Sequence, residues 1–259
     1  MNKDAWAAFE KARRRFRGAA EETDAALPAL IELQKRLVDG RGGPAYTVQT
    51  PVVYNEALDE VGPQSLIKLI LVGDNPGRRE QAARRYLVGP SGKIAENFFR
   101  SHPELGIDFR ENVIILNKTP VHTPRTAELK ELRRFLDTAS NADAFNRAMD
   151  ASQRVMAGLV LEFQKALSAG ASGEGIVPVW ITGYSEMKKG GIFEVYTETL
   201  RDLYLEDEAL LESLFFYRHF SMNQFTIDLR QKTEKEGGKN TAEILARIGA
   251  DYRKRILGR

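Results

Sequence analysis

The feature that most constrains the fold of this chain is a short, almost wholly apolar run at residues 66–72, which ends at Gly73. Only Lys68 interrupts the run. A run of this length and composition, closed by a glycine, is typical of a β-strand that is covered on both faces. Similar runs occur at residues 112–116, 177–182 and 214–218. The sequence therefore predicts four buried strands.

Apolar patterns with helical spacing lie between and around these strands. We predict helices at residues 5–16, from about residue 27 to Gly40, and at residues 91–101, 127–138, 142–168, 193–203 and 241–256, with loops at 40–51 and 170–175. Strands that alternate with helices indicate a mainly parallel sheet between two helical layers. We therefore expect a three-layer α/β/α fold with a four-stranded sheet.

We expect this fold to form one α/β domain over residues 1–259. In this division, residues 1–45 are an N-terminal helical extension, residues 60–225 are the core, and residues 226–259 hold a C-terminal helix.

The composition excludes several kinds of site. The chain has no cysteine, which excludes disulfides, thiol nucleophiles, zinc–cysteine sites and iron–sulfur clusters. Its three histidines, His102, His122 and His219, lack the spacing of metal ligands on a helix, so we expect no metal and no cofactor. No apolar run approaches the roughly 20 residues that span a bilayer, and the first residues are charged. We therefore expect a cytoplasmic protein without membrane contact.

Polar side chains follow three of the four predicted strands. Asp74 and Asn75 come after the first strand, Asn117 after the second, and His219 after the fourth. In open parallel sheets, ligands bind beyond the carboxyl ends of the strands. The sequence therefore predicts a site at this edge of the sheet, with these four side chains around it.

The turn Gly-Asp-Asn-Pro-Gly at residues 73–77 forms one wall of this expected site. Its two glycines permit close approach of the backbone, and Pro76 pushes Asn75 toward extended geometry. Such a turn presents N–H groups to an anion or a carbonyl, although Asn-Pro-Gly is also an ordinary turn sequence.

Familiar phosphate and nucleophile motifs are incomplete in this chain. No Gly-x-Gly-x-x-Gly follows the first strand. The segment around residues 89–93 lacks the first glycine of a P-loop, where Leu87 stands, and its Ser or Thr, where Ile94 stands. Met187 breaks the pattern of a nucleophile elbow at residues 183–187. Dinucleotide binding, P-loop nucleotidase and serine hydrolase are therefore disfavoured.

Four segments resemble the signature blocks of the uracil-DNA glycosylase superfamily. They are residues 69–77, 87–92, 112–120 with 123–126, and His219-Phe220-Ser221, and they occur in the order of the family. The resemblance covers residues 66–224 and is to bacterial members, here without an iron–sulfur cluster. It implies the fold of that family, which is a parallel four-stranded sheet between helices.

The resemblance implies hydrolysis of the N-glycosidic bond of uracil, or another altered base, after the base is flipped out of DNA. Asn75 corresponds to the asparagine that positions the attacking water, with Asp74 as the alternative; an aspartate here also has an ordinary role as a turn cap. Asn117 corresponds to the asparagine that hydrogen-bonds to the base, and Gly73 is expected at the base as well. Without the resemblance, the ordinary role of Asn117 is to cap the following turn. His219 corresponds to the histidine that donates to a base oxygen, and its ordinary role is a structural hydrogen bond.

Two departures from the family pattern concern the base pocket. Leu87 stands where the family has a phenylalanine that stacks on the flipped base, which leaves Tyr86, Phe98 or Phe99 to supply an aromatic face. Phe220 replaces the proline of the family's His-Pro-Ser block. These departures bear on uracil as the substrate more than on the fold.

The implied partner is DNA, single- or double-stranded, and the implied product is a free base such as uracil. The residues expected at the DNA are Arg78, Arg79, Ser91, Ser221, Met222 and Asn223. A net charge of +2 does not by itself indicate a nucleic-acid partner, and basic runs are also ordinary solvated helix faces. Two alternatives stay open: a catalytically weak nucleic-acid-binding protein of the same fold, and a small-molecule enzyme that binds nucleotides or sugar phosphates.

Overall fold

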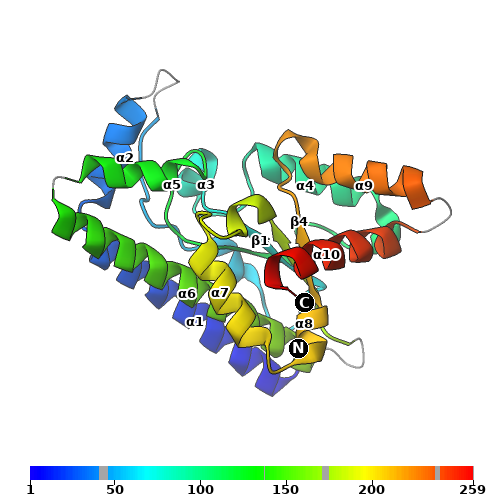
Figure 1. Ribbon diagram of the computed structural model, residues 1–259. Coiled ribbons are helices and arrows are strands. Elements are labelled where there is room, and N and C mark those ends of the chain that lie inside the picture. The colour runs from blue at the N-terminus through cyan, green and yellow to red at the C-terminus, as the bar shows by residue number, and fades with distance from the viewer. Residues whose placement is uncertain (41–45, 137, 171–174, 237–239, 259) are drawn as a thin grey trace.

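The computed structural model describes residues 1–40, 46–136, 138–170, 175–236 and 240–258. Its centre is a four-stranded sheet, all parallel, in the order β2-β1-β3-β4. The strands are β1 (Leu69–Gly73), β2 (Val113–Asn117), β3 (Val179–Thr182) and β4 (Leu214–Tyr217). Helices lie on both faces of the sheet (Figure 1), so the expected three-layer α/β/α fold is confirmed.

The sheet brings the carboxyl ends of its strands to one edge. Every residue of β1, β2 and β3 is buried, as expected for strands that are covered on both faces. β1 pairs with β2 from Leu69 beside Val113 to Gly73 beside Asn117. The last residues of these two strands are therefore direct neighbours.

One face of the sheet packs against α4 (Pro90–Ser101), α9 (Gln224–Glu236) and α10 (Thr241–Leu257). The indole of Trp180 stacks on Phe99 of α4 with 5.6 Å between ring centroids, and Phe225 of α9 lies 5.9 Å from the same ring. α10 packs on β4, where the Tyr217 hydroxyl donates to Leu245 O at 3.0 Å. Aromatic side chains thus form this half of the core.

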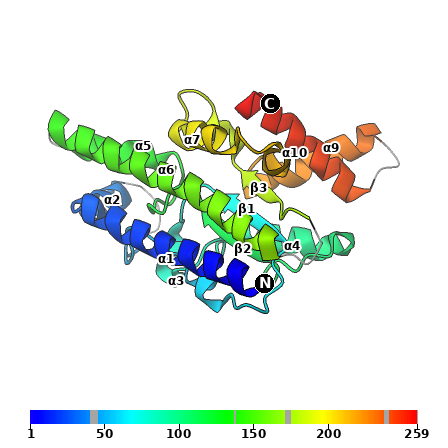
Figure 2. The same ribbon diagram turned by 90° about the horizontal axis from the view of Figure 1, so that it is seen from below.

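The other helical layer consists of α6 (Ala139–Gly170) with α1 (Lys3–Ala26) and α7 (Glu194–Tyr204). α1 and α6 run side by side in both views of the molecule (Figures 1 and 2). Phe9 of α1 meets Phe163 of α6 edge to face, with 5.1 Å between centroids, and both rings are fully buried. The N-terminal helix is therefore packed on the helix that covers the sheet.

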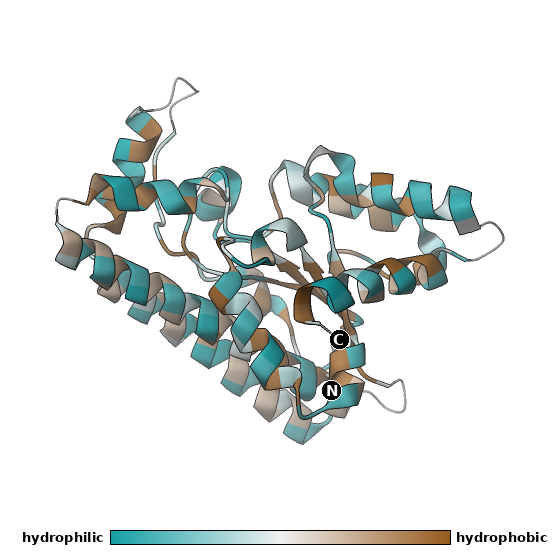
Figure 3. Ribbon diagram, viewed as in Figure 1, coloured by the Kyte–Doolittle hydropathy of each residue, from teal (hydrophilic) through white to brown (hydrophobic). Residues whose placement is uncertain are grey.

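Hydropathy follows this layering. The strands are hydrophobic, and the helices alternate between hydrophilic and hydrophobic residues (Figure 3), as amphipathic covering helices do. Within the described ranges, no helix has both the length and the apolar composition needed to cross a bilayer.

The first helix is longer than the sequence pattern predicted. We expected it to end at residue 16, but α1 continues to Ala26 because Ala19, Ala20 and Thr23 extend its buried stripe. It ends before Leu27, which precedes Pro28 and is therefore disfavoured in helical geometry. α2 (Leu30–Asp39) begins beyond this proline instead of near residue 27.

Several shorter elements also differ from the prediction. α3 (Arg78–Ala83), α8 (Glu208–Glu212) and α9 were not predicted, and the helix expected at 127–138 is α5 (Glu128–Glu131) followed by the 3-10 turn Leu132–Phe135. β3 begins at Val179 because Pro178 has no N–H for the strand ladder. Of the expected loops, residues 41–45 and 171–174 lie outside the described ranges, and Gly170 ends α6.

The contact of α10 with β4 depends on Gly249, which predicts a difference between two helix glycines. A Cβ at Gly249 would lie 2.5 Å from Phe215 Cβ, whereas a Cβ at Gly158 of α6 would meet only the end of the Arg15 side chain at 3.8 Å. We expect Gly249→Ala to lower the free energy of unfolding by about 1–2 kcal/mol, because overpacking outweighs the gain in helix propensity. Gly158→Ala should raise it by up to about 1 kcal/mol. Urea denaturation measures both, and equal effects would contradict the close packing.

Candidate active site

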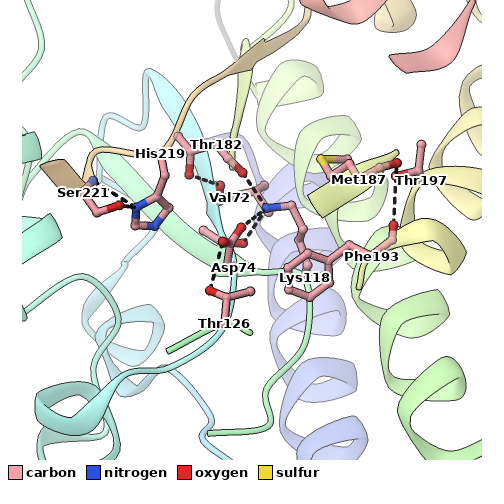
Figure 4. Close-up of polar contacts among 11 residues, drawn as sticks. Val72, Asp74, Lys118, Thr126, Thr182, Met187, Phe193, Thr197, His219 and Ser221 are labelled. Carbon is pink, nitrogen blue, oxygen red and sulfur yellow. Dashed lines mark hydrogen bonds and ion pairs between the residues drawn. The ribbon is translucent and has the colours of Figure 1, made fainter. Parts of the chain in front are cut away.

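The carboxyl edge of the sheet carries the residues that the sequence singled out. Asp74 and Asn75 follow β1, Asn117 is the last residue of β2, and His219 lies just beyond β4. In Figure 4, the imidazole of His219 and the carboxylate of Asp74 lie at this edge, with Lys118 beside Asp74. The fold therefore brings the ends of distant segments to one place.

A buried ion pair lies at the centre of this edge. Lys118 directly follows β2, its side chain is fully buried, and its Nζ lies 2.5 Å from Asp74 Oδ1. The same ammonium donates to the carbonyl oxygens of Thr182, at 2.5 Å, and Gly73, at 3.3 Å. Asp74 Oδ2 accepts from the Thr126 hydroxyl at 3.1 Å. The ammonium therefore joins the ends of β1, β2 and β3, and both carboxylate oxygens have partners.

Gly183 leaves the room that this ion pair needs. It follows β3 with a φ of 77°, in the left-handed region that favours glycine, and a Cβ there would collide with Asp74 Oδ1. Burial lowers the pKa of Lys118, and the charge of Asp74 opposes that shift. Asp74, which the sequence offered as an alternative base or a turn cap, is thus engaged in an ion pair.

The Asn75 side chain turns toward the segment that follows β2. Its Nδ2 donates to Thr123 Oγ1 at 2.9 Å, to Thr123 O at 3.2 Å and to Val121 O at 3.4 Å. Because these acceptors hold the nitrogen, the amide oxygen points away from them. An amide oxygen held in this way can accept a hydrogen bond from water, but it is too weak a base to remove the proton.

The Asn117 amide is buried against Gly73. Asn117 is 2% exposed. Its Oδ1 lies so close to Gly73 that a Cβ added at Gly73 would be only 2.5 Å from it. Among the described residues, no acceptor meets hydrogen-bond geometry at Asn117 Nδ2, although the Asn117 side chain acts on the Tyr86 hydroxyl and opposes the rise in the pKa of that group. A buried N–H without an acceptor costs about 1–3 kcal/mol. This donor is therefore suited to the carbonyl oxygen of a ligand.

The Tyr86 ring, expected as one aromatic face of the pocket, packs into the core. Its hydroxyl donates to Val53 O at 2.6 Å, and its ring lies 6.2 Å from that of Phe16. Burial raises the pKa of this hydroxyl. Phe98 and Phe99 of α4 are buried as well, and Phe99 is the ring that stacks on Trp180.

Leu87 has a strained backbone. Its φ is 50°, which costs a non-glycine residue roughly 1–2 kcal/mol, and its side chain is buried. A Cβ at Gly92, in the first turn of α4, would collide with the Leu87 carbonyl. Strained backbone that is held in place by its surroundings is found most often at active sites and ligand-binding segments.

Glu80 of α3 joins the turn at residues 73–77 to the segment of residues 87–89. Its carboxylate accepts the Gly77 N–H at 2.8 Å, and it also accepts the N–H groups of Leu87 and Gly89. The residue is buried, and burial raises the pKa of its carboxyl to about 7, against the lowering effect of the three N–H bonds. Glu80 was not among the sequence-predicted residues, although a glutamate three positions after Gly77 is a known signal at helix starts.

The hydrogen bonds of His219 define which of its nitrogens carries the proton. The Ser221 backbone N–H donates to Nδ1 at 3.0 Å, and the Ser221 hydroxyl lies 2.8 Å from the same atom. Because a backbone N–H can only donate, Nδ1 is an acceptor and the ring proton is on Nε2. Burial lowers the pKa of His219, and the charges of Asp74 and Lys118 act on it in opposite directions. The ring is thus a neutral Nε2–H donor.

His122, for which the sequence pattern indicated no role in the site, holds the other side of the turn. It is fully buried; its Nδ1 donates to Pro76 O at 2.8 Å, and its Nε2 lies 2.8 Å from the Tyr46 hydroxyl. Burial lowers the pKa of His122 to about 4. The neutral ring therefore fixes Pro76, next to Asn75.

The residues expected at the DNA lie around the candidate site. Arg78 and Arg79 are exposed on α3, and the Arg78 guanidinium lies 5.6 Å from the Tyr46 ring centroid. Ser91 is half-buried in the first turn of α4, and Asn223 is exposed with a φ of 55°. The side chain of Met222 lies outside what the structure describes. Throughout the described ranges, no three His, Asp or Glu side chains group closely enough to hold a metal ion.

No protein-family model matches this chain, and no curated protein matches it in sequence.

The Lys118–Asp74 pair predicts strong energetic coupling between the two residues. Lys118→Met leaves the Asp74 carboxylate buried without its cation, and we expect the free energy of unfolding to fall by about 3–5 kcal/mol. Adding Asp74→Asn should recover part of that loss. Denaturant unfolding of the two single variants and the double variant measures the coupling. Arg85→Gln, which breaks the exposed pair with Glu60, is the control and should cost about 1 kcal/mol or less. Additive effects of Lys118→Met and Asp74→Asn would contradict the pairing.

The burial of neutral His122 predicts a pH dependence of stability. The unfolded chain binds the proton near pH 6.5 and the folded chain only near pH 4, so stability present above pH 6.5 is lost as the pH falls toward 4. This residue should account for about 3 kcal/mol of that loss. Urea unfolding across this range should show a flatter profile for His122→Gln than for the wild type. His102→Gln controls for the loss of a histidine, and identical profiles for His122→Gln and the wild type would refute the prediction.

Proposed function

We propose that this protein is a DNA glycosylase that hydrolyses the N-glycosidic bond of uracil or another altered base in a flipped-out nucleotide. The observation that carries the proposal is the meeting of Asp74 and Asn75 after β1, Asn117 at the end of β2 and His219 after β4 at one edge of the sheet. The order of these segments along the chain is also that of the family that the sequence resembles.

In the proposed reaction, a water oxygen bonds to C1′ of the sugar while the bond from C1′ to the base nitrogen breaks. The base leaves with the electron pair as an anion, and the sugar passes through a cation-like transition state. The protein must therefore hold a water on one side of C1′ and hydrogen-bond donors near the base. After it has bonded to C1′, the water loses its proton to solvent, and the base anion takes up a proton from solvent, so the products are a free base and an abasic sugar.

Asn75 suits the first of these tasks. Its amide nitrogen is held by Thr123 and Val121, which orients the oxygen as an acceptor for the water. Catalysis by positioning without a strong base predicts slower turnover than a carboxylate would give.

Asn117 and His219 suit the second task. The unpartnered N–H of Asn117 is a donor for a carbonyl oxygen of the base, and its neighbouring Oδ1 accepts from a base N–H. The Nε2–H of neutral His219 is a donor for the oxygen that becomes negative as the base departs.

One observation favours a second candidate, a nucleic-acid-binding protein of the same fold with little or no turnover. The carboxylate that the turn supplies, Asp74, is paired with Lys118 and hydrogen-bonded to Thr126, so it is not available to activate water. Salt-dependent DNA binding without base release would support this candidate.

The proposal is tested with oligonucleotides that contain uracil, hypoxanthine, xanthine or a mismatch, in single- and double-stranded form, by measuring the free base released. We expect release from at least one of these substrates. Asn75→Ala and His219→Ala should each slow it by about 100-fold or more, because each removes a group that acts in the transition state.

Asn141→Ala, at an exposed position in the first turn of α6, is the matched asparagine control and should leave the rate unchanged. Failure of every substrate to release a base would refute glycosylase activity. Binding of a free nucleotide without binding of DNA would indicate a small-molecule enzyme instead.

A further inference from the structure

A stack of two tyrosines lies beside the candidate site and has no role in the proposed reaction. The rings of Tyr184 and Tyr252 are 4.2 Å apart between centroids, with 23° between their planes. Lys188 Nζ lies 5.3 Å from the Tyr184 centroid, and Arg255 Cζ lies 5.4 Å from the Tyr252 centroid. We call these four residues the tyrosine platform. Both rings are half-buried, and both cations are exposed.

The tyrosine platform is connected to the candidate site by two separate paths. Tyr184 directly follows Gly183, where an added Cβ would collide with the Asp74 carboxylate. The Tyr252 hydroxyl donates to Asp228 Oδ2 at 2.8 Å, and the same carboxylate oxygen lies 3.3 Å from Arg218 Nε, next to His219. The tyrosine platform therefore borders the site on the side of β3 and β4.

The two elements that form the tyrosine platform come from distant parts of the chain. Tyr184 belongs to the 3-10 turn Tyr184–Met187 after β3, and Tyr252 belongs to α10, which packs on that turn. α10 lies outside the residues 66–224 that resemble the glycosylase family. The tyrosine platform is therefore not a feature that the resemblance implies.

The chemistry of the tyrosine platform matches that of a nucleobase with its phosphates. The inner face of each ring is taken by the other ring, so the cations lie over the outer faces. A cation over an exposed ring contributes about 0.5–1 kcal/mol, whereas a base stacked on an aromatic side chain contributes about 1–3 kcal/mol. Stacking of a base is therefore the stronger of the two contacts, and a Lys188 or Arg255 side chain displaced by a base is free to pair with a phosphate.

We propose that the tyrosine platform binds an unpaired base of the same nucleic-acid strand that enters the candidate site. The proposal rests on the proposed function, because it takes a strand at that site as given. Bases within a duplex stack on one another, so only a single-stranded segment can offer a base to Tyr184 or Tyr252. The substrate class that follows is single-stranded DNA, or DNA with an unpaired segment beside the target base.

The test measures binding by fluorescence anisotropy with two probes of about 15 nucleotides, which span such a surface: a thymidine oligonucleotide and an abasic oligonucleotide of the same charge. We expect the wild type to bind the thymidine probe about 5- to 100-fold more tightly than the abasic probe. Tyr184→Leu and Tyr252→Leu should abolish this preference. Tyr184→Phe and Tyr252→Phe keep the rings and should keep the preference.

A charge variant separates stacking from electrostatic attraction. Lys188→Gln combined with Arg255→Gln should reduce the slope of log affinity against log salt by about 1 and leave the preference for thymidine over abasic DNA in place. Equal binding of the two probes by the wild type, or an unchanged preference in both leucine variants, would overturn the proposal and leave the stack as a contact within the fold.

Photo-crosslinking of the wild type with a 5-iodouridine oligonucleotide does not depend on the folding of any variant. Crosslinks at Tyr184 or Tyr252, located by peptide mass, support the proposal, and crosslinks confined to other residues overturn it. Base release is measured separately. A preference for thymidine without release of any base supports base binding by the tyrosine platform and refutes glycosylase activity. Base release without the preference supports glycosylase activity and refutes base binding by the tyrosine platform.

Discussion

The buried contact between Lys118 and Asp74 is the constraint on which the architecture of the site depends. An ammonium has three N–H groups, and the structure supplies three acceptors for them: the Asp74 carboxylate and the carbonyls of Gly73 and Thr182. Removal of two charges from water is costly, so such a pair persists only when its geometry satisfies both partners. Because the acceptors belong to β1 and β3 and the ammonium follows β2, this one contact sets the spacing of three strand ends.

Buried polar side chains hold the rest of the site by the same principle. Glu80 gathers three backbone N–H groups, His122 holds Pro76, and Ser221 fixes the tautomer of His219. Glu80 and His122 have hydrogen-bond partners within the described chain, whereas no acceptor meets hydrogen-bond geometry at Asn117 Nδ2. An unsatisfied donor at the end of a strand is the feature on which the proposed role of Asn117 in binding a base depends.

The fold and the positions of the strand-end residues could be predicted because buried parallel strands leave a local record. Each is a short apolar run, and Asp74, Asn75, Asn117 and His219 come directly after such runs. Lys118 could not be predicted in its role, since its partners Asp74 and Thr182 are 44 and 64 residues away along the chain. A lysine after a strand is ordinarily solvated, and no local pattern marks it as buried. The packing of Tyr86 into the core could not be predicted for the same reason, because it depends on Phe16, which belongs to the distant helix α1.

The three hydrogen bonds of Glu80 make the lengths of two loops depend on each other. Its carboxylate links the turn that ends at Gly77 with the segment of Leu87 and Gly89, so the two loops share one anchor. An insertion or deletion in either loop shifts the N–H groups that the other loop also relies on through Glu80. A change in the length of either loop therefore disturbs both segments, whereas replacement of an exposed side chain leaves their shared anchor in place.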